Sequence, residues 1–278
     1  MKSARATSTR RRKASKVERV APNALERPGA SWGSAFAKAS AGKQAAPPES
    51  SFAWIGGLLQ AGDSFYPTGS YAHSFGLEGL AQEGVVHDQA TLGKFLFLSA
   101  LPALRRTDLP LAAHAWRALE TPDWARVGEI SVLASALKTA TEARAAAGNI
   151  GRQRAELCVS LHGHPLAREY LRRATATDWP FSPPVSAALE GRVLGAPLPA
   201  VLAGVYYASV ASLLAAAMKL LRLGQNGCQA LLTAAMQQAA ADIAIAMDTP
   251  FDEIGWFNPW LDIAAARHET ADGRLFIS

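Results

Sequence analysis

The residues that could do metal chemistry in this 278-residue chain are few. His162-Gly163-His164 places two histidines one residue apart, and imidazole is a common ligand for divalent metals. Two histidines without a third ligand make a weak site, and His-Gly-His before Pro165 is also an ordinary polar turn. The sequence therefore predicts no metal site, with His162 and His164 as weak candidates.

Three other side chains could serve acid–base catalysis. Asp63 and Glu78 could pair as catalytic carboxylates, and His73 could be a base or a ligand. More often such acids cap backbone or bind arginine, and such a histidine hydrogen-bonds at a loop–helix junction. The chain contains no GxSxG, HExxH, P-loop or GxGxxG motif. The sequence predicts a protein that is not an enzyme, and any nucleotide would have to be bound by a partner.

The stretch 60–80 holds several of these side chains in a region rich in glycine, proline and small polar residues. Such residues predict a tight loop, because proline fixes φ and glycine supplies positive φ. Ser70 is the predicted N-cap of a following helix, on which Tyr71, Phe75 and Glu78 share one face. The stretch is predicted to present an aromatic and a carboxylate side chain at a helix start.

The rest of the body shows helical patterns, with little β-branched alternation and few hairpin turns. The sequence predicts an all-α fold, a single helical-bundle-like domain over residues 51–278 with short Gly/Pro loops. The expected helices are 51–60; 91–101; one opened by Thr121-Pro122-Asp123 and reaching 137; 139–154 with an interruption at Asn149; 198–223 ended by Gly224; 227–247; and one from Asn258-Pro259 to His268.

Residues 1–50 differ in charge from the body. They hold 11 basic and 3 acidic residues, a net charge of +8, whereas the other 228 residues hold 17 and 20, a net charge of −3. Few large apolar residues accompany this charge, so a disordered basic tail is predicted. A solvated extension is favoured over nucleic-acid binding by Arg10-Arg11-Arg12-Lys13, and the composition also fits an organelle transit peptide. No apolar segment follows the charges, so no secretory signal is predicted.

Cysteine usage and hydropathy give information about the cellular compartment of the protein and about membrane contact. Cys158 and Cys228 are far apart, which suits a reducing compartment and excludes a cysteine zinc knuckle. The uncharged stretch 200–218 is long enough to span a membrane. It is largely Ala and Ser and contains Tyr206 and Tyr207, so a buried helix is favoured and no membrane contact is predicted.

Three further segments have compositions that suit contacts or turns. Glu142 and Arg144 face different ways on a predicted helix, so one could anchor and the other present, but a solvated Ala-rich helix is the favoured interpretation. Residues 219–227 predict an αα-hairpin. The C-terminus ends in Arg274 followed by an apolar triplet that includes Phe276. Burial of each such side chain is worth roughly 1.5–3 kcal/mol, so docking into a groove on this chain or on a partner is predicted.

These segments resemble the F-type urease accessory proteins, the UreF family. Residues 65–80, FYPTGSYAHSFGLEGL, match the family's Pro-x-Gly-Ser-Tyr-x-x-Ser-x-Gly-Leu-Glu signature. Three further matches follow in order: a Thr/Glu-x-Arg helix at Glu142 and Arg144, a Leu-Gly-Gln turn and Gln-x-Leu-Leu helix at 223–232, and an acid-Ile helix with an Arg-Leu-Phe tail at 262–276. The resemblance covers residue 52 to the end and leaves out the first fifty residues.

The resemblance implies a cytoplasmic, all-helical, dimer-forming chaperone for nickel insertion into urease. Such proteins bind the accessory protein D (also called H) and recruit the nickel-carrying GTPase G to apo-urease. No cofactor would be bound firmly, because nickel is handled by the complex. The family's signature Tyr and tail Arg carry over to Tyr71 and Arg274. The predicted partner-binding residues are Tyr71, His73, Glu78, Glu142, Arg144, Gln225, Arg274 and Phe276.

Departures from the family pattern affect the C-terminal tail most. Ile277 stands where a second Arg is common, no aromatic residue precedes Arg274, and residues 177–191, with three prolines, are not clearly family-like. Two alternatives remain open at this point. One is a helical nucleic-acid-binding regulator that uses the basic tail, and the other is a helical hydrolase that uses His73 and Glu78.

Overall fold

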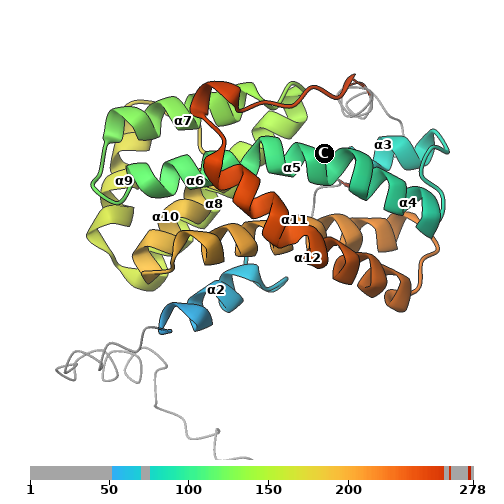
Figure 1. Cartoon of the computed structure of the whole chain (residues 1–278). Coiled ribbons are helices and arrows are strands. Elements are labelled where there is room, and N and C mark those ends of the chain that lie inside the picture. The colour runs from blue at the N-terminus through green and yellow to red at the C-terminus, as the bar shows by residue number, and fades with distance from the viewer. Residues whose placement is uncertain (1–51, 70–75, 260–262, 264–274, 277–278) are drawn as a thin grey trace, which may run out of the picture. The chain divides into compact units, whose positions relative to one another are not determined.

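Helix is the regular structure of the part of the chain that the computed structural model describes, residues 52–69, 76–259, 263 and 275–276 (Figure 1). No strand occurs within these ranges. Ala, Leu, Gln and Arg, which have high helix propensity, are frequent throughout them. The predicted all-α class is confirmed. The basic tail predicted for residues 1–50 lies outside the described residues.

The helices follow one another with short connections. They are α2 (Trp54–Gly62), α3 (Leu77–Gln82), α4 (Gln89–Phe95), the π-helix η2 (Leu96–Ala100), α5 (Leu101–Arg106), α6 (Asp108–Ala118), α7 (Trp124–Ala136), α8 (Thr141–His162), α9 (Pro165–Ala176), α10 (Pro183–Leu194), α11 (Leu198–Leu220), α12 (Gln225–Asp248) and the 3-10 helix η3 (Phe251–Glu253).

Two apolar cores share helix α6. Leu109, Ala112 and Ala113 face a first core formed with α3, α4, α5, α11 and α12. Leu111 and Ala115 face a second core formed with α7, α8, α9 and α10. These two sets lie on opposite sides of a helix with 3.6 residues per turn. Figure 1 shows α3 and α9 at opposite ends of the view, with α5 and α6 between them.

Helix α10 is the most enclosed part of the second core. Residues Pro184–Gly191 are all buried, between α6 on one side and α8 on another. Gly151 of α8 permits this approach, because a Cβ there would lie 2.7 Å from the Cα of Ser182. The hydroxyl of Ser186 donates to the Gly151 carbonyl over 2.7 Å in the same contact.

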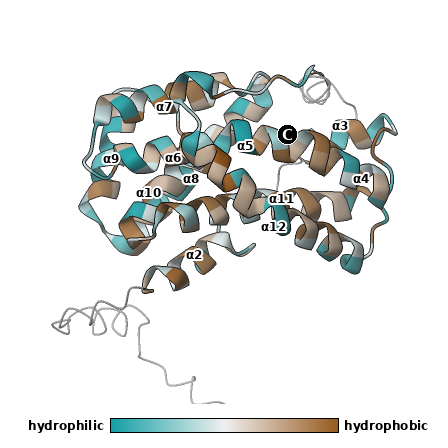
Figure 2. Ribbon diagram, viewed as in Figure 1, coloured by the Kyte–Doolittle hydropathy of each residue, from teal (hydrophilic) through white to brown (hydrophobic). Residues whose placement is uncertain are grey.

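In contrast to α10, helix α2 buries only Ala61 and carries apolar residues on its surface (Figure 2).

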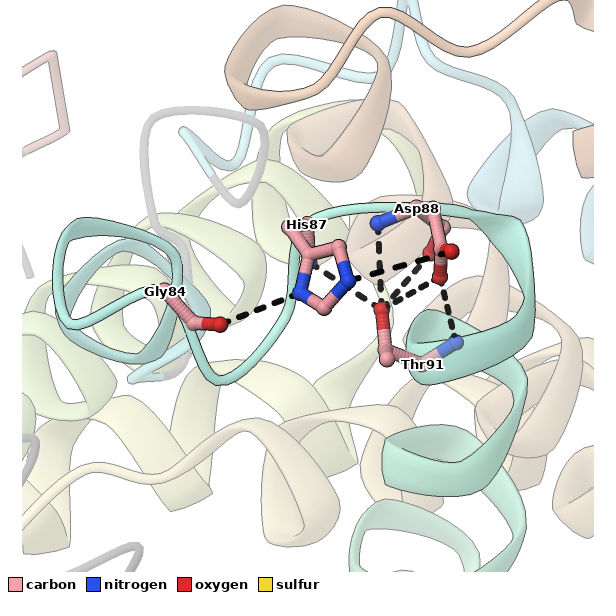
Figure 3. Close-up of polar contacts among 4 residues, drawn as sticks. All are labelled: Gly84, His87, Asp88 and Thr91. Atoms are coloured by element: carbon pink, nitrogen blue, oxygen red, sulfur yellow. Dashed lines mark hydrogen bonds and ion pairs between the residues drawn. The ribbon is translucent and has the colours of Figure 1, made fainter.

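Helix α4 begins two residues earlier than predicted, at Gln89. Asp88 is its N-cap: the carboxylate accepts from the Thr91 backbone N–H over 2.8 Å, and the Thr91 hydroxyl accepts from the Asp88 N–H over 3.0 Å (Figure 3). These bonds lower the pKa of Asp88. The Nδ1 of His87 also donates to the Gly84 carbonyl. This reciprocal capping box is a local structure that satisfies orphan helix donors.

Two predicted features of the middle helices were wrong. The N-cap of α7 is Asp123, whose carboxylate accepts from the Arg126 N–H over 3.1 Å, and not Thr121. Helix α8 runs without a break through Asn149. Asparagine has a low helix propensity, but that is a small local preference, and burial of Ala146 and Ile150 on either side stabilises the helix.

The connection between α11 and α12 also differs from the prediction. Helix α11 ends at Leu220, and Gly224 has φ −75°, so it is the N-cap residue of α12 and not the left-handed end of α11. Gln225 and Asn226 lie in the first turn of α12. Both helices are long and apolar enough to cross a membrane by length and composition. In α11, buried Leu202 and other residues pack into the first core, as predicted for this stretch.

Candidate functional site

The glycine–proline loop, residues 63–69, is shaped by its own side chains and backbone. The Asp63 carboxylate accepts from the Phe65 N–H over 2.7 Å, so this acid caps backbone. The backbone N–H groups of Tyr66 and Thr68 bond back to the carbonyls of Asp63 and Tyr66. Gly69 has φ +79°, which glycine adopts readily. The loop leaves Phe65 92% exposed while Tyr66 is 7% exposed.

The side chain of Tyr66 joins the loop to two helices. Its hydroxyl donates to Oε1 of Glu190 on α10, and Arg154 Nε on α8 donates to Oε2 over 2.8 Å. Burial, followed by the Glu190 charge, raises the pKa of Tyr66. Glu190 is not predicted from the sequence, because no local pattern links residues 124 positions apart.

The helix after the loop begins later than predicted. Gly76 has φ +82°, so a single regular helix cannot run through it, and α3 begins at Leu77. The predicted N-cap Ser70 and the helix face with Tyr71 and Phe75 lie outside the described residues. Glu78 lies in the first turn of α3 and is 1% exposed.

Glu78 binds the C-terminal segment of the same chain. Its two carboxylate oxygens accept from the backbone N–H groups of Leu275, over 2.7 Å, and Phe276, over 3.1 Å. Phe276 is 5% exposed, and the Lys219 ammonium of α11 lies 5.3 Å from the centre of its ring. Leu275 is 73% exposed. The tail is therefore docked on its own chain, one of the two alternatives that the sequence predicted.

The tail and the loop meet at one shallow recess. It is lined by loop residues Phe65, Tyr66 and Pro67 together with Lys219 and Phe276. We call residues 63–69, Lys219, Leu275 and Phe276 the loop–tail surface. Tyr66 and Phe276 are buried in it, whereas Phe65 and Leu275 are apolar and exposed next to the polar side chains of Asp63, Ser64 and Lys219. Exposed apolar side chains on a supported surface suit contact with a partner.

A cavity of about 150 Å³ lies below the loop. Asp63, Tyr66 and Thr68 of the loop line it, and α8 contributes Ala147, Ile150 and Arg154. The α8 segment that carries predicted residues Glu142 and Arg144 therefore runs beside the loop. Arg144 is exposed and Glu142 is half-buried.

Gln225, His162 and His164 do not line the recess of the loop–tail surface. Gln225 is exposed in the first turn of α12. His162 ends α8, and His164 is the N-cap of α9, with Nδ1 accepting from the Leu166 N–H over 3.1 Å. Arg144 and His162 are 18 residues apart on one helix, about 27 Å at 1.5 Å per residue. Among the described residues, no group of three or more His, Cys, Asp and Glu could hold a metal ion.

Three predicted contact residues, Tyr71, His73 and Arg274, lie outside the described residues. Glu78 and Phe276 are described, and both are engaged inside the chain. The assignment of Glu78 and Phe276 to partner binding stays a prediction. They would contribute to binding by holding the C-terminal segment in the loop–tail surface.

Comparisons with known proteins agree on one family. The family model UreF matches residues 86–236. The urease accessory protein UreF of Corynebacterium efficiens is 30% identical over 220 residues, which cover 79% of this chain and 95% of the relative. Those of an Arthrobacter species and of Granulibacter bethesdensis are also 30% identical, covering 80% and 77% of this chain and 96% and 89% of the relatives. The family model and these three relatives carry the name of a urease accessory protein and not that of a nucleic-acid-binding protein or a hydrolase.

Proposed function

This chain belongs to the UreF family of urease accessory proteins, and from that premise we propose that it is a scaffold for nickel insertion. In this proposal it binds the D- or H-type accessory protein and recruits the nickel-carrying GTPase of the G type to apo-urease. Nickel is the cargo of the complex, and the chain contributes contacts and not catalysis. A homodimer is part of the proposal, on the grounds of the family resemblance.

The observation that carries this proposal is the docking of the C-terminal segment beside the loop. Two parts of the chain that are about 200 residues apart in sequence form one surface, since Glu78 and Leu275 are separated by 197 positions. The surface exposes Phe65 and Leu275, and Lys219 adds a positive charge. Large apolar side chains on a supported surface are typical of binding hot spots. A partner with an apolar pocket and an acidic rim fits this chemistry.

Tyr71 and Arg274 are proposed as partner contacts because the family resemblance implies this role, and His73 is proposed with them because it belongs to the same signature segment as Tyr71. Glu142 and Arg144, in the first turns of α8, and Gln225, in the first turn of α12, are proposed as further contacts. The proposal predicts that a Tyr71→Ala, Arg274→Ala double variant loses both partner binding and urease activation.

Complementation tests the proposal directly. The full chain is expressed in a urease-positive host that lacks its F-type factor, and urease activity and co-purification of D- and G-type proteins are measured. Phe65→Ala is expected to weaken co-purification by about tenfold, the loss typical of a hot-spot residue. Phe257→Ala is the matched control, since Phe257 is 80% exposed but lies outside the loop–tail surface. Absence of urease activity with the wild-type chain, or equal losses in the two variants, would contradict the proposal.

A further inference from the structure

Within the part of the chain that the structure describes, two buried clusters have the same chemistry, each with a tyrosine hydroxyl, a carboxylate and a guanidinium group. In the loop cluster, Tyr66 and Arg154 both donate to Glu190, which is 1% exposed. Arg154 forms an ion pair with Glu190, and its side chain is 16% exposed. Because the pKa of Tyr66 is raised, the phenol stays protonated and remains a donor through the neutral range.

The core cluster repeats this arrangement elsewhere. Tyr206 Oη donates to Asp242 Oδ2 over 3.2 Å, and Arg105 Nη1 donates to Oδ1 over 3.1 Å. Asp242 is also 1% exposed, and burial raises the pKa of Tyr206. The single phenol proton is shared between Asp242 Oδ2 and the Ala235 carbonyl, which lies 3.1 Å from Oη. Gln238 Nε2 also donates to Asp242 Oδ2, over 3.0 Å. The two clusters therefore bury comparable groups in comparable ways.

The two clusters differ in what they connect. The core cluster joins three helices, α5, α11 and α12, which also pack through the first core. The loop cluster joins two helices to a segment without regular structure, since Tyr66 belongs to the loop. In the core cluster, neighbouring apolar contacts hold the tyrosine whether or not its hydroxyl is present. Tyr66 is also buried, at 7% exposed, but it belongs to neither of the two apolar cores.

Packing beneath the loop is incomplete. The cavity of about 150 Å³ is lined by Asp63, Tyr66 and Thr68, so fewer protein atoms pack against this side of the loop. On the outer side, Phe65 is 92% exposed. A segment with a cavity on one side and solvent on the other depends strongly on its long-range polar contacts. The Tyr66 hydroxyl provides such a contact, to a carboxylate that Arg154 holds in place.

We propose that Glu190 and Arg154 are positioning residues for the loop–tail surface, and that the Tyr66 hydroxyl is the connection through which they hold the loop. Arg154 orients the Glu190 carboxylate, and the carboxylate fixes the phenol, so Phe65 is presented in one place to the partner. This inference rests on the proposed function, because it assigns a role in partner binding to residues that touch no partner.

The variant that removes the fewest atoms from the loop cluster tests this inference with the least risk of unfolding the chain. Truncating Glu190 or Arg154 would leave a buried charge without its partner, and such variants commonly fail to fold. Tyr66→Phe keeps the ring and removes the hydroxyl alone. Tyr206→Phe is the matched control, because it removes the equivalent hydroxyl from the core cluster.

The experiment uses the full chain and a purified D-type urease accessory protein as the probe. Binding affinity, melting temperature and hydrogen exchange of the Phe65 and Thr68 amides are measured for both variants. Tyr66→Phe is expected to bind about tenfold more weakly, the size of one lost hydrogen bond to a charged group, and to exchange the loop amides faster. Tyr206→Phe is expected to lower the melting temperature while affinity and loop exchange stay at wild-type values.

Wild-type affinity and wild-type loop exchange in Tyr66→Phe would overturn the inference, as would equal losses of affinity in both variants. Failure of the wild-type chain to bind the D-type protein would count against the proposed function instead. In that case the exchange of the loop amides still decides whether the loop cluster fixes the loop.

Discussion

Glu78 shows how a single side chain can connect two segments that are nearly 200 residues apart in sequence. Its carboxylate is buried, and both of its oxygens accept from consecutive backbone N–H groups of the tail. A buried carboxylate is unfavourable unless it is hydrogen-bonded, and two backbone donors meet that need. The same bonds hold Phe276 in its recess. Docking of the tail therefore depends on the carboxylate of Glu78 as well as on apolar packing of Phe276.

Glu78→Gln is expected to release the tail. The amide has one acceptor oxygen and places an NH₂ group opposite the second N–H, so one bond of about 1–3 kcal/mol is lost. Hydrogen exchange of the Leu275 and Phe276 amides should become faster, while the helices keep their circular dichroism. Glu83→Gln is the control, because Glu83 is exposed at the other end of α3. Unchanged exchange at both tail amides in Glu78→Gln would refute this role.

At the scale of elements, close helix approach depends on particular glycines. Helices α8 and α10 touch at Gly151, where any side chain would meet the backbone of Ser182. Gly204 in α11 has open space around the position of a Cβ. These two glycines are both within helices, and only tertiary contacts distinguish them.

The two glycines should respond to alanine in opposite ways. Gly151→Ala is expected to lower the free energy of unfolding by about 1–3 kcal/mol, because α8 and α10 must move apart. Gly204→Ala is expected to raise it by about 0.4–1 kcal/mol, since alanine lowers the entropy of the unfolded chain. Urea unfolding of both variants measures the difference. A stabilised Gly151→Ala protein would show that the helix contact is looser than described.

For the molecule as a whole, buried phenols link stability to alkaline pH. Burial raises the pKa of Tyr170 to about 12, and it also raises the pKa values of Tyr66 and Tyr206. A raised folded-state pKa means that the folded chain holds the proton more tightly than the unfolded chain. Stability is therefore full below pH 10 and falls as pH rises from 10 through 12.

Tyr170→Phe is expected to remove part of this alkaline loss. For one phenol whose pKa moves from 10.0 to about 12, the loss between pH 10 and 12 is about 2 kcal/mol. Denaturant unfolding at pH 8, 10 and 12 should show a shallower decline in the variant than in the wild type. Parallel declines in the two proteins would mean that Tyr170 does not contribute.

The sequence by itself determined the features that depend on near neighbours. Helical periodicity indicated the all-α class, and four motifs in order indicated the family. The predictions were wrong at two helix ends: Asp123 and not Thr121 caps α7, and Gly224 is the N-cap of α12 and does not end α11.

Tertiary structure alone decided how the candidate site is assembled. Tyr66 meets Glu190 across 124 positions, and Glu78 meets the tail across 197 and 198 positions. No periodicity or capping rule extends over such separations, because these rules arise from atoms within a few residues of one another. Contacts between distant segments depend on how helices pack into the two cores. The loop and the tail could each be predicted from the sequence as contact segments, but their positions beside one another follow only from helix packing.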